Sequence, residues 1–170
     1  NARGGEWAHM DQGRHLIHFT IDWKDVQSAT HSILGSVATT ANPQTGSFGV
    51  LVPEGFIPEF LEVTPVVALT SSGTIGSADI TIGTKKASDR STEYDHDGLA
   101  TTSFVCGVLD ATAEGPTRIK VGTTGAGDDY GVAYTENAVI TVANSGHASH
   151  PLTAGVLKCV LAGRYGLASV

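Results

Sequence analysis

The sequence predicts an all-β protein, an antiparallel, jelly-roll-like β-sandwich of about eight strands with an irregular N-terminal arm. Several short segments alternate apolar and polar residues, which is the two-residue period of a half-buried strand. Clusters of turn-forming residues separate these segments at spacings typical of a sandwich or jelly roll. No segment keeps the helical period of 3.6 residues over three turns, so we expect helix to be a minor component.

The N-terminal part of the chain divides into an arm and a first strand. Residues 1–14 show no period and predict the irregular arm, whereas residues 15–170 are expected to form a single β-sandwich domain. Residues 15–23, HLIHFTIDW, alternate cleanly, with one face made of Ile17, Phe19, Ile21 and Trp23. Residues 24–37 are expected to hold a short helical turn or a loop, and turn-forming residues follow in TTANPQTGS (39–47).

The next elements are two strands and a turn that contains proline. Phe48, Val50 and Val52 predict a short strand that stops at the PEG turn, residues 53–55. Residues 61–69 alternate again, with a proline at position 65. Because proline cannot donate a hydrogen bond to a strand ladder, it predicts an edge strand or a bulge. The turn SSGTIGS (71–77) and the apolar residues after it predict a hairpin with a returning strand.

The second half of the chain is less regular until its last third. Residues 84–117 show the weakest pattern, and within them 99–115 are expected to be a long connection with one helical turn. Three strands are predicted after that, interrupted by the turn clusters GAGDD and SGHASHPLT. They are residues 117–123, 130–144 and 154–166.

Composition and charge exclude several classes of function. The chain has a net charge of −7, and its ten Lys and Arg residues form no run, so we expect no nucleic-acid partner. No apolar stretch approaches the roughly 20 residues of a membrane-spanning helix, so we expect no membrane partner. Charged residues make up only 16% of the chain, against about 25% in an average soluble domain. A surface with so few charges suits lasting contact with other proteins.

The segment EYDHDG (93–98) is the strongest candidate for a polar site. The two aspartates that flank its histidine, followed by a glycine, could supply oxygen ligands to Ca²⁺. An EF-hand loop, however, needs a glutamate at its twelfth position, and counting from Asp95 that position is Cys106. We therefore expect an exposed loop at the end of the sandwich, with acidic groups that could serve in a contact between subunits.

The histidines and the glycine-rich segment do not predict a metal or phosphate site. His15 and His18 are three residues apart, which on a strand directs them to opposite faces. His147 and His150 share a predicted loop but have no third ligand nearby. The segment GTTGAGDDYG (122–131) lacks the Lys-Ser/Thr ending of a P-loop, so a flexible hairpin loop is expected there.

Nothing in the sequence indicates catalysis. No GxSxG motif is present, and Cys106 and Cys159 stand alone without a recognisable histidine partner. Cys159 lies in an apolar run and is expected to be a buried free thiol. We predict no catalytic, cofactor-binding or metal-binding residue, no cofactor and no enzymatic activity. A glycosidase or a cupin-like metalloprotein stays as a further alternative, because clustered histidines and carboxylates could still meet in the fold.

Carbohydrate binding is the main alternative function, because aromatic rings stack on sugars in many β-sandwich lectins. Most of the tyrosines are predicted near loops, whereas Trp23 falls on the apolar side of its strand and suits the core. The aromatic residues that could line a sugar platform are Trp7, Trp23, Tyr94, Tyr130, Tyr134 and Tyr165. They keep open a carbohydrate- or receptor-binding β-sandwich domain.

Four segments together resemble a known family. They are VPEGFIP (52–58), FLEVTPVVALTSSGTIGSADITIGT (60–84), DHDGLATTSF (95–104) and NAVITVANSGHASHPLTAGVLKCVLAGRY (137–165). In this order they are similar to the small jelly-roll capsid decoration, or cement, proteins encoded beside the capsid genes of tailed bacteriophages. The resemblance covers roughly residues 45–166, and its motifs are structural rather than catalytic.

The resemblance implies a structural virion protein that binds the outside of a phage head and stabilises contacts between capsid subunits. Its partner would be the major capsid protein, and it would act as a homotrimer on the capsid surface after synthesis in the host cytoplasm. Binding several subunits at once adds free energy only to the assembled shell. The arm, residues 1–14, is our candidate for reaching onto a neighbouring subunit, because a segment that orders on contact can cover a large area.

Overall fold

A computed structural model gives the fold and describes residues 7–11, 14–26, 32–33, 49–72, 80–89, 93–101, 117–120, 127–144, 149 and 151–166. These residues form strands and one short 3-10 helix, η1 (Trp23–Val26). The strands are β1 (Trp7–Asp11), β2 (Arg14–Asp22), β3 (Ser32–Ile33), β4 (Leu51–Val52), β5 (Phe56–Ser71), β6 (Ile80–Lys86), β7 (Glu93–Ala100), β8 (Thr117–Lys120), β9 (Ala138–Asn144) and β10 (Leu152–Tyr165). Within this part of the chain, no helix is long and apolar enough to cross a membrane.

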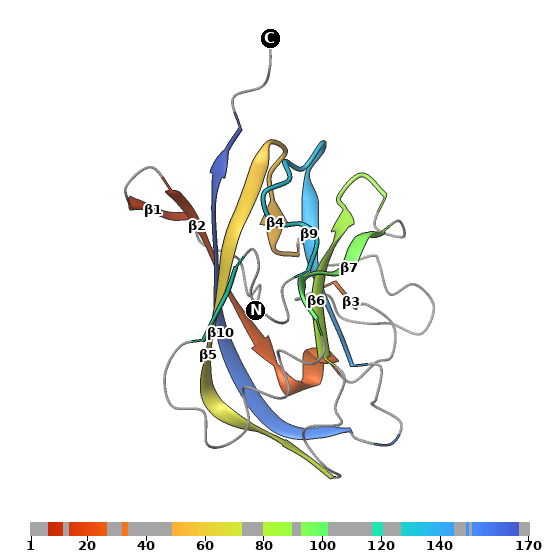
Figure 1. Ribbon diagram of the computed structural model, residues 1–170. Helices are drawn as coiled ribbons and strands as arrows, with labels where there is room; N and C mark the ends of the chain where they lie inside the picture. The colour runs from red at the N-terminus through yellow and green to blue at the C-terminus, as the bar shows by residue number, and fades with distance from the viewer. Residues whose placement is uncertain are drawn as a thin grey trace.

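The strands form two sheets that pack face to face (Figure 1). Sheet A has the order β1-β2-β10-β5-β8. Sheet B has the order β3-β9-β6-β7, and β4 also pairs with β9. Every pairing in both sheets is antiparallel. The predicted all-β antiparallel sandwich is confirmed.

The pairing order is that of a jelly roll. Four pairs are nested in the chain: β2 with β10, β4 with β9, β5 with β8, and β6 with β7. Successive pairs alternate between sheet A and sheet B. A long hairpin of four such pairs, rolled so that alternate pairs fall in opposite sheets, is the eight-stranded jelly roll. β1 and β3 are additions at the margins of the two sheets.

The N-terminal segment is more ordered than the sequence predicted. Trp7–Asp11 forms β1 and pairs with β2, so the expectation of an irregular arm over residues 1–14 is wrong for that part. β2 then runs to Asp22 with Ile17, Phe19 and Ile21 buried, as its alternation predicted. It ends where Asp22 accepts a hydrogen bond from the backbone N–H of Lys24 (3.1 Å), which starts η1.

β5 contains two prolines, and both lie beside bulges. This strand pairs with β10 over its whole length and with β8 over part of it. One register shift lies next to Pro58 and leaves Glu59 as an extra residue in β5. A second shift lies next to Pro65 and leaves Val66 as an extra residue. The predicted bulge is therefore confirmed, because a bulge accommodates a residue that cannot donate to the ladder.

Four sequence predictions in the middle of the chain are wrong. β5 and β6 do not form a hairpin, because they belong to different sheets. The segment 93–98 is not a loop, since it lies within β7, the edge strand of sheet B. Residues 130–137 are not strand, and β8 and β9 do not form a hairpin around the glycine-rich segment, because they too belong to different sheets. The connection predicted over residues 99–115 does not begin at 99, because residues 99–100 end β7, and its part after Thr101, with the predicted helical turn, lies outside the described residues.

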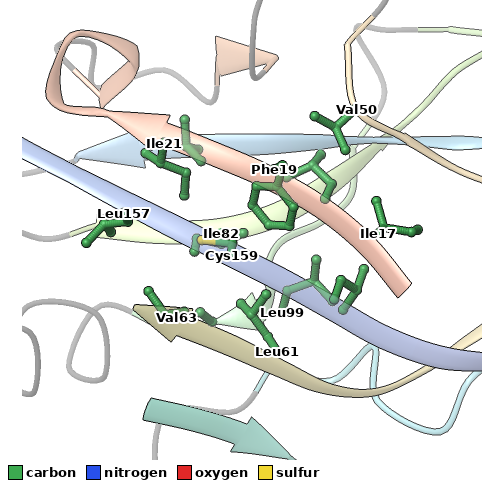
Figure 2. Close-up of a cluster of buried hydrophobic side chains, with 14 of the residues drawn as sticks. Ile17, Phe19, Ile21, Val50, Leu61, Val63, Ile82, Leu99, Leu157 and Cys159 are labelled. Carbon is green, nitrogen blue, oxygen red and sulfur yellow. The ribbon is translucent and has the colours of Figure 1, made fainter. Parts of the chain in front are cut away.

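The core fills the space between the two sheets, as Figure 2 shows. The inward side chains of β2, β5, β6 and β10 meet there, and the free thiol of Cys159 is buried among them, as predicted. Burial raises the pKa of this thiol, so it packs as a small apolar group. Among the largest fully buried side chains are Phe56, Leu61, Ile82, Leu99, Ile140, Leu157 and Leu161.

Candidate functional site

The fold brings together two segments that the sequence had singled out separately. The end of the glycine-rich segment packs on β7, where the backbone N–H of Asp129 donates to the carbonyl of Gly98 (3.1 Å). The contact is so close that a Cβ on Gly127 would lie 2.1 Å from the backbone oxygen of Asp97. A Cβ on Gly98 would lie 2.5 Å from the carboxylate of Asp129. Glycine at both positions is therefore what lets the two segments meet.

Asp129 is the centre of this cluster. Its Oδ2 accepts hydrogen bonds from the hydroxyl of Tyr134 (2.6 Å) and from that of Thr84 (3.3 Å). Burial raises the pKa of Asp129 above its ordinary value of 3.8, and the negative charge of Asp95 adds to the increase. The two hydroxyl donors act in the opposite direction, because they stabilise the ionised form. The carboxyl group of Asp129 therefore has a structural role, because it accepts hydrogen bonds from side chains within the protein.

The tyrosines of the cluster face inward. Tyr130 is buried and donates its hydroxyl to the carbonyl of Leu99 (2.7 Å). Tyr134 is also buried, and its ring meets the ring of Tyr94 edge to face at 5.4 Å. Burial raises the pKa of both Tyr130 and Tyr134, so both hydroxyls stay protonated and serve as donors. Rings in these positions cannot stack on a sugar.

The other candidate residues are dispersed. Trp23 packs partly buried against the core, and Tyr165 is 37% exposed and meets His15 edge to face at 4.5 Å. His18 lies on the opposite side of β2 from the buried residues. Among the residues that the structure describes, no three His, Cys, Asp or Glu side chains are placed to hold a metal ion. The following fall outside what the structure describes: the side chains of Trp7, Glu93 and His96, and all of Cys106, His147 and His150.

The surface around this cluster is acidic and tied together by hydrogen bonds. Glu136 pairs with Lys86 (3.0 Å) and accepts a hydrogen bond from Ser88. The hydrogen bond from Ser88 and the contact with Lys86 lower the pKa of Glu136. Asn137 joins two more turns, because its carbonyl accepts from the N–H of Ala87 (2.8 Å) and its side chain accepts from the N–H of Glu54 (2.9 Å). This arrangement stabilises one end of the sandwich and presents no reactive centre.

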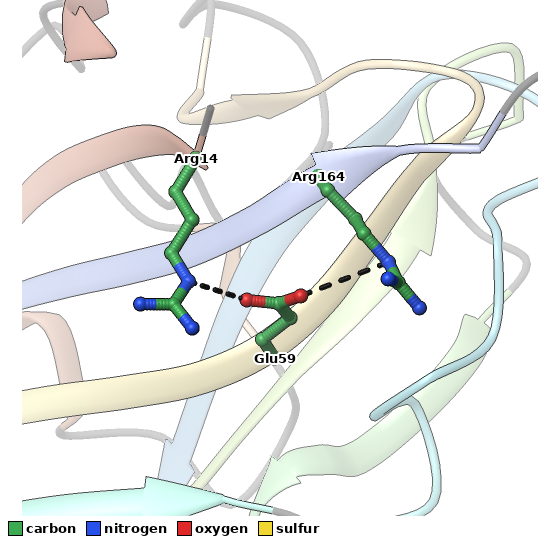
Figure 3. A network of polar contacts seen from close by, with 3 residues as sticks. All are labelled: Arg14, Glu59 and Arg164. Atoms are coloured by element: carbon green, nitrogen blue, oxygen red, sulfur yellow. Dashed lines mark hydrogen bonds and ion pairs between the residues drawn. The ribbon is translucent and has the colours of Figure 1, made fainter. Parts of the chain in front are cut away.

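A second polar contact lies on the outside of sheet A. Glu59, the extra residue at the first bulge of β5, reaches Arg14 of β2 (Nε–Oε2 2.7 Å) and Arg164 of β10 (Nε–Oε1 3.6 Å), as Figure 3 shows. The guanidinium of Arg14 also lies over the ring of Phe60 at 5.8 Å. Bulges often redirect a side chain in this way. Both arginines stay at least half exposed, with side-chain exposures of 50% and 65%.

The third surface feature is apolar. Val66, the extra residue at the second bulge, is 53% exposed, and Val67 beside it is 46% exposed. They lie where β5 pairs with the first residues of β10, a ribbon that curves away at the lower end of Figure 1. We call this two-stranded ribbon, residues 63–72 and 151–157, the distal ribbon. It contains no charged residue.

Sequence reasoning missed the distal ribbon as a surface. Pro65 was the available signal, since it predicted a bulge. In a regular strand, one of the two neighbouring valines, Val66 and Val67, would face the core. A bulge breaks this alternation, so both can be exposed. The burial of Asp129 had no comparable signal, because it depends on contacts with β6 and β7 that are distant in the sequence.

Comparison with known proteins adds no relative. No protein-family model, no curated protein and no solved structure matches this chain significantly. Support for a function therefore comes from the residues and the geometry described above.

Proposed function

We propose that this protein is a capsid decoration protein that binds the outside of a tailed-phage head, holds neighbouring capsid subunits together and acts as a trimer. The resemblance of residues 45–166 to the phage decoration proteins suggests this role, and the jelly-roll pairing order is consistent with it. The observation that carries the proposal is the distal ribbon, which exposes Val66 and Val67 on a stretch without charge.

The distal ribbon has the properties of a contact surface. Apolar area removed from water contributes roughly 25 cal/mol per Å², and an uncharged surface loses little hydration when it is covered. The distal ribbon carries no charge that would repel an acidic partner surface. Three such ribbons in one trimer would bind a shell multivalently, so that modest single contacts give a durable attachment.

No observation favours the carbohydrate-binding alternative to the same degree. Tyr130 and Tyr134, two of the rings that a sugar platform would need, are buried and bonded within the fold. We therefore propose the decoration role alone.

The proposal is tested by co-sedimentation with mature tailed-phage heads assembled from the major capsid protein that is the proposed partner. Val67→Asp places a charge in the distal ribbon and should weaken binding by about a hundredfold, because an unpaired charge would be buried in the contact. Val132→Asp is the matched control, since Val132 is 60% exposed but lies in the turn before β9.

The control variant should bind like the unaltered protein, and both variants should keep its circular dichroism spectrum. Absence of the unaltered protein from the pelleted heads would refute the decoration role. Equal binding of both variants would refute the part assigned to the distal ribbon.

A further inference from the structure

Among the residues that the structure describes, acidic side chains gather at one end of the sandwich. The turns before β5, after β6 and before β9, together with β7, meet there through the contacts of Asn137 and Asp129. We call this surface the acidic end. Its surface carries six carboxylates and one lysine, a formal charge of −5. Its residues are Glu54, Lys86, Asp89, Asp95, Asp97, Asp128 and Glu136.

The arginine pair on sheet A has the opposite sign. Arg14 and Arg164 share a single carboxylate, Glu59, so the three residues together carry a formal charge of +1. The longer contact, 3.6 Å to Arg164, is an ion pair rather than a hydrogen bond, which leaves the donors of that guanidinium for another acceptor. Further along the same sheet, Lys158 and Glu62 balance each other in formal charge.

The two surfaces lie at the same end of the sandwich but belong to different layers. The backbone N–H of Gly166, just after β10, donates to the carbonyl of Gly55 (3.0 Å), in the turn that carries Glu54. This contact places the end of β10, and with it Arg164, beside the turn at the margin of the acidic end. Figure 1 shows this end of β10 on the opposite side of the sandwich from β6 and β7.

We propose that the arginine pair of one copy binds the acidic end of a second copy, and that this head-to-tail contact closes the trimer. The inference rests on the proposed function, because it names the contact by which decoration subunits associate. Two acidic ends facing each other would place a formal −5 against −5, which opposes a symmetric contact between them. A contact between unlike surfaces repeats from copy to copy and closes a ring when the rotation allows it.

The test is sedimentation velocity at about 0.02 M NaCl, where charges interact over roughly 20 Å. Arg164→Glu and Asp128→Arg each reverse one charge on one of the two exposed surfaces, and each should weaken association by about tenfold or more. The double variant R164E/D128R exchanges the two charges and should regain most of the lost association. Lys24→Glu, on η1 and outside both surfaces, is the control and should leave association unchanged.

Three results would each overturn the inference. The first is that the unaltered protein is monomeric at low salt. The second is that the single reversals leave its association unchanged, and the third is that the double variant fails to regain the lost association. A salt titration of the unaltered protein gives a second measurement that needs no variant: association should fall steeply between about 0.02 M and about 0.5 M NaCl, and a salt-independent trimer would contradict it.

The head-binding assay separates this inference from the proposed function. If the protein forms a charge-dependent trimer but does not bind phage heads, the decoration role is refuted and the proposed contact between copies stands. If the protein binds phage heads but neither charge reversal changes its self-association, the proposed contact is refuted and the decoration role stands.

Discussion

At the scale of single residues, Asp129 shows how a carboxyl group is held inside this fold. Its pKa is raised chiefly by burial and further by the charge of Asp95, while the hydroxyls of Tyr134 and Thr84 partly offset the increase. The folded state therefore binds the proton of Asp129 more tightly than the unfolded chain does. Stability from this group is present at low pH and is lost as the pH rises from 3.8 through the raised pKa.

Asp129→Asn should remove this pH dependence. The amide oxygen can still accept from Tyr134, but it never ionises, so the variant avoids the loss that the carboxylate causes at neutral pH. We expect the melting temperature of D129N, relative to the unaltered protein, to be higher at about pH 7 than at about pH 4.

The measurement is thermal unfolding followed by circular dichroism across that range. Asp128→Asn is the matched control, because Asp128 is exposed and its removal should change the profile much less. A constant offset of D129N at every pH would contradict the account of Asp129.

The sequence could identify single apolar residues but not this carboxylate. Ile17, Phe19 and Ile21 are buried as their alternation predicted, because period alone decides which face of a strand meets the core. Asp129 was predicted to lie in a flexible loop, since Gly and Asp neighbours are typical of turns. Its burial arises from contacts with Gly98 and Thr84, which no local pattern can reveal.

At the scale of elements, bulges determine which side chains β5 exposes on the surface, and glycines determine how closely a neighbouring segment packs on β7. The two bulges of β5 that lie beside its prolines each add one residue, and these residues are the carboxylate that joins the arginine pair and a valine of the distal ribbon. The glycine-rich segment acts differently, since its last residues pack tightly against β7 instead of forming an open loop.

Gly127→Ala should lower the free energy of unfolding by about 3 kcal/mol, because the new Cβ would meet backbone atoms that cannot move aside. The matched control is Gly131→Ala in the same segment. A Cβ added at Gly131 would meet no neighbouring atom, but the φ of this residue is 82°. We therefore expect G131A to lower the free energy of unfolding by about 1 kcal/mol, from the left-handed backbone alone.

Urea denaturation of both variants provides the measurement. Equal losses of stability, or a larger loss for G131A, would show that the segment does not pack against β7 as described.

Element type was predictable where the pattern was local, but pairing was not. Alternation located β2, β5 and most of β9 and β10. β7 was missed because its side chains, Asp95 and Asp97 among them, are mostly polar although it lies at the edge of a sheet. The predicted hairpin between β5 and β6 failed because neighbours along the chain of a jelly roll alternate between sheets.

At the scale of the whole molecule, charge is distributed so that different surfaces suit different contacts. The acidic end and the arginine pair lie at one end of the sandwich, on different layers, and the distal ribbon lies at the other end (Figure 1). We infer that the charged surfaces join copies of the chain and that the uncharged ribbon contacts the capsid. Composition predicted a surface with few charges, but only the fold separates the charged surfaces from the uncharged one.

Electron cryo-microscopy of mature heads, reconstructed with and without added protein, tests the decoration role most directly. We expect added density at the threefold positions of the shell, made of three jelly rolls whose distal ribbons touch the capsid and whose acidic ends face the neighbouring copies. Two identical reconstructions at saturating protein would contradict the role.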